Sequence, residues 1–373
     1  MSTAVIAVGA LSACSGEREA GPTTKPSGQT SGGTGSTGGE LIGIAMPTKS
    51  LERWNRDGAN LEKLLQDAGY KTSLQYADNK QDQQNNQLQN MLNDGAKVLV
   101  IASIDGEALG PVLDQAASKK VPVVAYDRLI NGSENVDYYA TFDNYKVGQM
   151  QGQYILDNAA SFKNEDGSIN LEPFAGSPDD NNAKFFFSGA WDLVGPKVQS
   201  GEFTVPSGKA PKSNDEWTTI GIPAWQSATA QSEMENRLNS FYGGGKKVNI
   251  VLSPNDSLAL GIEQALDGAG YKVGGDWPLV TGQDADLANV KALLEGKQSM
   301  TVWKDTRKLG ETVAKMVQQI IKGETVEVND TKTYDNGKKV VPTFLVDPQV
   351  VTKDDVQTAL VDSGFYSASD LGL

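Results

Sequence analysis

Short apolar runs alternate along the chain with segments whose apolar residues recur every three or four positions. Runs at residues 41–46, 71–77, 97–102, 121–126 and 138–141 predict buried strands. Helical periodicity separates them: Trp54, Leu61, Leu65 and Ala68 share one face before Gly69, and similar patterns occupy residues 81–93 and 106–118. Strands and helices in alternation predict a parallel, doubly wound sheet.

The same alternation begins again after residue 144. Helices are expected at residues 145–159, 183–199, 228–241 and 258–268, and strands at 171–175, 218–222, 248–252 and 279–282. The sequence therefore predicts an α/β fold of two doubly wound, Rossmann-like domains.

The last part of the chain has too few elements for a third core. It offers helices at 290–295 and 306–322, a strand at 300–302 and an extended segment at 342–346. We expect residues 40–142 with 286–341 to form a first lobe, and residues 143–285 with 342–373 to form a second. The chain would cross between the lobes near residues 142–144, 284–286 and 341–347, and three short crossings make a hinge.

The first 39 residues have a different composition. Residues 1–13 are mostly small and apolar and lead into Leu11-Ser12-Ala13-Cys14. This pattern is typical of a bacterial lipoprotein signal, with Cys14 as the lipidated residue, although the basic start of a signal peptide is missing. The alternative is an incidental thiol. Residues 15–39 are rich in Gly, Ser, Thr and Pro and predict a flexible tether, so we expect a protein lipid-anchored to the outer face of the cell membrane.

Composition excludes several classes of function. The 33 basic and 47 acidic residues give a formal net charge of −14, which argues against binding nucleic acid. The chain has no histidine and one cysteine, so it lacks the commonest general base and any internal disulfide. It also lacks a nucleophile elbow, a phosphate-binding loop and metal-ligand spacing. Only the acidic pair Asp284 and Asp286 could suggest a metal or a glycosidase, so we expect no enzyme, no metal and no cofactor.

Polar side chains follow many of the predicted strands. In open α/β sheets ligands bind just beyond the carboxyl ends of the strands, so these side chains are candidate ligand contacts. The candidates are Lys49, Glu52, Arg53, Trp54, Asp127, Arg128, Asn181, Asn182, Trp225, Asn255, Asp284 and Lys304.

These residue types suit a sugar. Carboxylates accept hydrogen bonds, Arg and Lys donate them and amides do both, so the set can bind neighbouring hydroxyl groups. The C–H faces of a sugar ring pack on aromatic rings, and Trp54 and Trp225 come from different lobes. Simpler interpretations stay open: an ion pair between Asp127 and Arg128, tryptophans in the core, and ordinary charged helix starts at Lys49 and Glu52.

Seven stretches resemble the periplasmic sugar-binding proteins of ABC transporters, of the ribose, xylose and galactose type. They are residues 51–54, 95–102, 125–130, 138–144, 177–183, 282–286 and 329–334. The chain is similar to this family from about residue 41 to residue 366, above all to members that bind several monosaccharides or xylose. The resemblance implies the type I periplasmic-binding fold and a sugar in the cleft between the lobes. It implies cleft contacts from Arg53, Asp127, Arg128, Asn181 or Asn182, Trp225, Asn255 and Asp284, with Lys304 nearby.

The resemblance also implies a role. A monosaccharide such as xylose, arabinose, galactose or glucose would close the hinge, and the closed form would engage an ABC permease and its ATPase. Gln226 and Asn255 depart from the family's pattern, so the sequence leaves the sugar open. A sensor whose closed form engages a signalling receptor is the alternative, whereas a repressor would need a helix-turn-helix in place of the tether. We expect a monomer.

Overall fold

The computed structural model describes residues 39–373 of the chain. The predicted signal segment 1–14, its Cys14 and nearly all of the tether 15–39 lie outside the described residues. Within residues 39–373 no helix is both long and apolar enough to cross a membrane. The described residues belong to one compact unit, which contains two α/β lobes as predicted.

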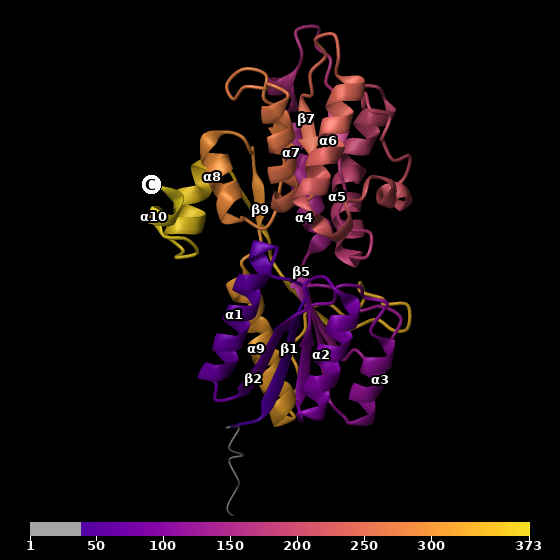
Figure 1. The fold of residues 1–373 in the computed structure, drawn as a ribbon, viewed down its shortest axis with the longest axis vertical. Coiled ribbons are helices and arrows are strands. Elements are labelled where there is room, and N and C mark those ends of the chain that lie inside the picture. Colours follow the sequence, from indigo (N-terminus) through magenta and orange to yellow (C-terminus); the bar gives the residue numbers. More distant parts are fainter. Residues whose placement is uncertain (1–38) are drawn as a thin grey trace, which may run out of the picture. The chain divides into compact units, whose positions relative to one another are not determined.

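The first lobe is built on a six-stranded parallel sheet with the order β10-β5-β4-β3-β1-β2. Figure 1 shows α1 and α9 on one face of this sheet and α2 and α3 on the other, and each pair covers its own apolar cluster. The elements are β1 (Leu41–Met46), α1 (Glu52–Asp67), β2 (Lys71–Tyr76), α2 (Gln81–Asn93), β3 (Val98–Ile101), α3 (Gly110–Ser118), β4 (Val123–Tyr126), β5 (Tyr138–Phe142), α9 (Thr306–Lys322) and β10 (Thr343–Val346).

The second lobe has a smaller parallel sheet with the order β6-β7-β8. Its main elements are α4 (Asn144–Asn158), β6 (Leu171–Pro173), α5 (Asn181–Gln199), α6 (Ser227–Phe241), β7 (Ile250–Leu252), α7 (Asp256–Gly268) and β8 (Leu279–Val280). The later elements are α8 (Leu287–Glu295), β9 (Thr301–Trp303), β11 (Gln349–Val351) and α10 (Ala368–Leu371). Short 3₁₀-helices cover Ala159–Phe162, Asn214–Ile220, Pro223–Trp225 and Lys353–Asp355, and a π-helix covers Val356–Val361.

The predicted division of the chain between the lobes is wrong in two segments. Residues 286–303 were assigned to the first lobe, but Val302 bridges Gln283 and belongs to the apolar core of the second lobe. Residues 342–346 were assigned to the second lobe, but β10 pairs with β5 at the edge of the first sheet. The later crossings therefore fall after β9 and after β10. Both errors concern long-range strand pairing, which local periodicity does not encode.

The strand predicted at residues 218–222 is also wrong. The 3₁₀-helix Asn214–Ile220 occupies most of it, and only Gly221 makes a single bridge, to Ala175. Trp217 and Ile220 are both buried and lie three residues apart, the spacing that brings side chains together in a 3₁₀-helix. The β-branched residues suggested a strand, but the burial of Trp217 decides the local structure.

Helices α4 and α5 pack against each other at glycine positions. A Cβ on Gly148 would lie 2.0 Å from the carbonyl oxygen of Phe186, and one on Gly189 would lie 2.1 Å from that of Tyr145. Only glycine permits this approach. At the start of α5, Asn182 donates to the carbonyl oxygen of Asp127, directly after β4 of the first lobe.

Candidate ligand-binding site

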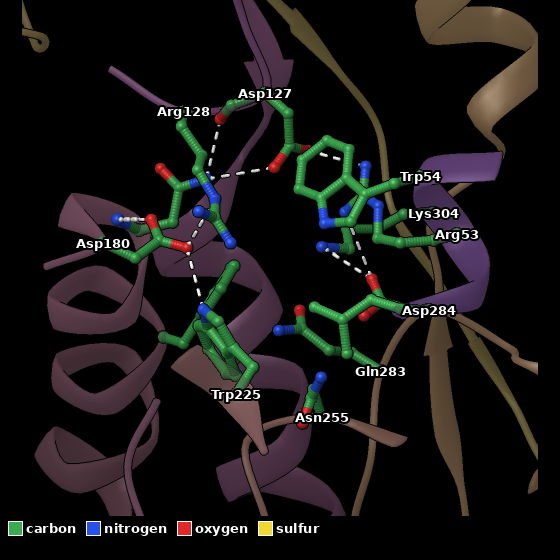
Figure 2. Close-up of a pocket in the computed structure, with 13 residues that line it drawn as sticks. Arg53, Trp54, Asp127, Arg128, Asp180, Trp225, Asn255, Gln283, Asp284 and Lys304 are labelled. Atoms are coloured by element: carbon green, nitrogen blue, oxygen red, sulfur yellow. Dashed lines mark hydrogen bonds and ion pairs between the residues drawn. The ribbon is translucent and has the colours of Figure 1, made fainter. Parts of the chain in front are cut away.

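A cavity is lined by residues of both lobes. Figure 2 shows most of its lining side chains converging from α1, the ends of β4, β8 and β9, and the second-lobe loops. Nine predicted contacts line it: Arg53, Trp54, Asp127, Arg128, Asn182, Trp225, Asn255, Asp284 and Lys304.

Three predicted residues do not line the cavity. Asn181 is the first residue of α5 and is partly exposed. Lys49 is exposed, and its amine lies 4.9 Å from the ring centroid of Tyr76. Glu52 pairs with Arg56 at 2.8 Å and accepts a hydrogen bond from the Leu287 amide, so it links the lobes outside the cavity.

The prediction missed four lining residues: Leu51, Asp180, Phe186 and Gln283. Asp180 and Gln283 directly precede Asn181 and Asp284, so the strand-end argument covered their positions. Leu51 and Phe186 are apolar and carry no polar signal in the sequence. Their place in the wall is visible only once α1 and α5 are packed.

Arg53 lies at the centre of the site. Its Nε donates to Asp57 at 3.0 Å, its Nη2 to Asp127 at 2.9 Å and its Nη1 to Asp284 at 3.3 Å. Burial opposes its charge, yet these carboxylates raise the pKa of Arg53 well above its ordinary value. The guanidinium also lies 4.7 Å from the ring centroid of Trp54. A fixed, charged donor thus faces the cavity.

Asp284 connects Arg53 to Lys304. The Lys304 amine lies 2.8 Å from the same carboxylate oxygen that accepts from Arg53. Burial favours the neutral acid, but Lys304 and then Arg53 outweigh it and lower the pKa of Asp284. The Lys304 amine also lies 5.1 Å from the ring centroid of Phe186. Asp284 is therefore held as a carboxylate at the cavity wall.

The second-lobe side of the cavity is organised by Asp180. Its carboxylate caps α5, pairs with Arg128 at 3.0 Å and accepts from Trp225 Nε1 at 3.1 Å. Arg128 pairs with Asp180 and not with Asp127, so the simple ion pair considered from the sequence does not form. Burial raises the pKa of Asp180 although Arg128 opposes the shift.

Three lining residues have a left-handed backbone: Asp127 at φ 61°, Trp225 at φ 54° and Asp284 at φ 98°. Such conformations cost on the order of 1–3 kcal/mol each and cluster at functional sites. Asp127 is held in place because Asn182 Nδ2 donates to its carbonyl oxygen at 2.7 Å. That hydrogen bond joins the two lobes.

Three buried polar atoms in the wall have no hydrogen-bond partner among the described residues: Trp54 Nε1, Gln283 Oε1 and Arg128 Nε, of which only Arg128 Nε has an ion-pair partner, Asp180. Asn255 caps α7 through its oxygen, which accepts from the Leu258 amide at 3.0 Å, and its amide nitrogen is left for the cavity. Buried donors and acceptors are normally satisfied, so these atoms indicate a polar ligand. Residues 39–373 contain no acidic or cysteine cluster placed to hold a metal ion.

The family model described as a periplasmic binding protein domain matches residues 42–325. This chain belongs to the periplasmic binding protein family. The multiple sugar-binding periplasmic protein SbpA of Azospirillum brasilense is 50% identical over 87% of this chain and 89% of its own. The D-xylose-binding periplasmic protein of Escherichia coli (strain K12) is 34% identical over 88% of this chain and 92% of its own.

Among solved structures, this periplasmic binding protein is similar to an ABC transporter solute-binding protein from Clostridium phytofermentans. The two share 49% identity with a TM-score of 0.84, over 89% of this chain and all of the other. That structure holds bound β-D-glucose. These similarities confirm the predicted family and fold, and they place the chain in a family of binding proteins and not of enzymes.

Proposed function

We propose that the cavity binds a monosaccharide, and that the nine predicted residues lining it are contacts for the sugar. The observation that carries the proposal is the charge balance of the wall. Its three cations, Arg53, Arg128 and Lys304, each pair with a carboxylate of the wall. A neutral ligand with many hydroxyl groups can share these donors and acceptors without adding a charge.

An anionic ligand fits the cavity poorly. A phosphate or carboxylate would need an unneutralised cation, and the three lining cations are already opposed by Asp127, Asp180 and Asp284. Sugar phosphates and sugar acids are therefore expected to be rejected. The bound β-D-glucose in the Clostridium phytofermentans relative supports an aldose as the ligand, and the description of SbpA as a multiple sugar-binding protein supports a sugar.

The proposed role is the extracytoplasmic binding component of an ABC importer. The hydrogen bond from Asn182 to Asp127 and the ion pair from Arg53 to Asp284 join the lobes across the cavity. A sugar would enter when these contacts open at the three crossings and would be enclosed when they form. Cys14 would carry the lipid that keeps the receptor at the cell surface. Mass spectrometry that found Cys14 without diacylglycerol would refute the anchor.

Calorimetry on the full chain tests the binding proposal. Glucose, galactose, xylose, arabinose and ribose should include at least one tight ligand, whereas glucose 6-phosphate and gluconate should not bind. Asp127→Asn removes a carboxylate next to Arg53, and the loss of a charged hydrogen bond should weaken binding about 10- to 100-fold. Asp67→Asn, at the exposed pair with Lys63 on α1, is the matched control. Absence of any sugar ligand would reject the proposal.

A further inference from the structure

Asp57 and Tyr126 form a buried pair behind Arg53, on the side away from the cavity. Asp57 is one helical turn after Arg53 on α1, and its side chain is fully buried. One carboxylate oxygen accepts from Arg53 Nε at 3.0 Å, and the other accepts a short hydrogen bond from the Tyr126 hydroxyl. Neither residue lines the cavity.

We infer that Asp57, held by Tyr126, is a positioning residue that sets the guanidinium of Arg53 for the ligand. The inference rests on the proposed sugar-binding function. Arginine has five N–H donors. Asp57, Asp127 and Asp284 each take one, which leaves one N–H on each Nη atom for a ligand.

The location of Asp57 distinguishes it from the other two acids. Asp127 and Asp284 line the cavity, so a ligand competes with Arg53 for their oxygens. Asp57 cannot be reached by a ligand and keeps its bond to Nε whatever occupies the cavity. It therefore fixes the plane of the guanidinium while Asp127 and Asp284 exchange partners.

The contact with Asp57 also lies within one lobe. Arg53 and Asp57 share α1, and Tyr126 ends β4 of the same lobe. The contact with Asp284 comes from the second lobe and depends on closure. Asp57 can thus hold Arg53 in its binding geometry before the lobes meet, and preorganisation of this kind lowers the entropy cost of binding.

The test is glucose binding by the full-length chain and its Asp57→Asn variant at pH 8. We expect the variant to bind roughly tenfold to a hundredfold more weakly, because the arginine loses a charged partner. Asp67→Asn carries the same change at an exposed (i, i+4) pair on the same helix and should bind as the wild type does. Thermal melting checks that each variant is folded.

Tyr126→Phe tests the inference through the pH dependence of sugar affinity, which a purely structural role of Asp57 would leave unchanged. The charged and titratable groups facing Asp57 are Arg53 on α1, Tyr126 and Asp127 at the end of β4, and Tyr76 on β2. Burial raises the pKa of Asp57, and the Tyr126 hydroxyl limits the rise. Without that hydroxyl, the affinity for glucose should be near normal at pH 8. As the pH is lowered, the variant should lose affinity at a higher pH than the wild type does.

The outcomes separate the two proposals. A wild-type chain that binds none of the sugars overturns the proposed function and this inference with it. A wild type that binds any of the five sugars, with a folded Asp57→Asn variant that binds the same sugar equally well, overturns only the role of Asp57. If Asp57→Asn does not fold, the pH profile of Tyr126→Phe decides: a profile identical to that of the wild type refutes the inference.

Discussion

Gly176 lies directly against the indole ring of Trp225. A Cβ at this position would be 1.9 Å from Trp225 Cη2, and 2.4 Å and 2.5 Å from Cζ2 and Cζ3. These distances place the added atom over the face of the ring. Ordinary contact begins near 3.4 Å, so Gly176→Ala must displace the ring by about 1.5 Å, the difference between 3.4 and 1.9 Å.

That displacement has a second consequence. Trp225 Nε1 donates to Asp180 at 3.1 Å, and a shift of this size along the ring normal stretches and misaligns that hydrogen bond. Leaving a buried donor without its partner costs about 1–3 kcal/mol, or about 5- to 140-fold in Kd if the loss falls on the liganded form. The ring also moves into the space that we assign to the sugar.

Calorimetry with glucose measures the effect on Gly176→Ala. Gly243→Ala is the matched control, because a Cβ on Gly243, in the same lobe, meets no atom within 4 Å. We expect the first variant to lose affinity and the second to keep it. A folded Gly176→Ala chain with the wild-type Kd would show that Trp225 does not form a wall of the ligand site.

Two further predictions concern residues outside the cavity. The guanidinium of Arg56 joins the lobes through Asp286 at 3.2 Å and through Tyr366. Arg56→Met removes it, so calorimetry should show glucose binding about two- to tenfold more weakly. Lys63→Met on the same helix is the control, and an equal loss of affinity in that variant would contradict the explanation. Burial raises the pKa of Glu263 from 4.5 to about 8, so the folded chain keeps this carboxyl protonated where the unfolded chain ionises it. The resulting contribution to the free energy of unfolding is fully present below pH 4.5 and is lost as the pH rises to 8. Its size is at most about 5 kcal/mol. Urea titrations at pH 5, 7 and 9 should show that Glu263→Gln removes this decline in the free energy of unfolding. A variant whose stability falls with pH as steeply as that of the wild type would refute the prediction.

Local signals located individual elements well. The helix predicted at residues 306–322 forms as α9, because its apolar positions share one face, Asp305 caps its start and Gly323 ends it in the left-handed conformation. The segment at 218–222 failed because its β-branched residues favour a strand, while Trp217 buries its ring through a 3₁₀-turn. Periodicity does not specify which buried environment a side chain will find.

The residues of the candidate site that directly follow strands were predictable from the sequence. Asp127 directly follows β4, and Asp284 lies a few residues after β8, so the carboxyl ends of parallel strands were enough to place them. The partners of these residues were not predictable. Arg128 pairs with Asp180 of the other lobe. Arg53 forms ion pairs with Asp57, Asp127 and Asp284. Only a packed chain brings groups so far apart in sequence within hydrogen-bond distance.

The sequence by itself determined the alternation of strands and helices, the two α/β lobes and the polar residues at their strand ends, because these depend on spacing along the chain. The tertiary structure decided which lobe takes residues 286–303 and 343–346, since strand pairing is a long-range choice. It also decided how the charges of the cavity are shared. Those charges cancel within the wall, and that balance, set by distances between lobes, is what favours a neutral sugar over an anion.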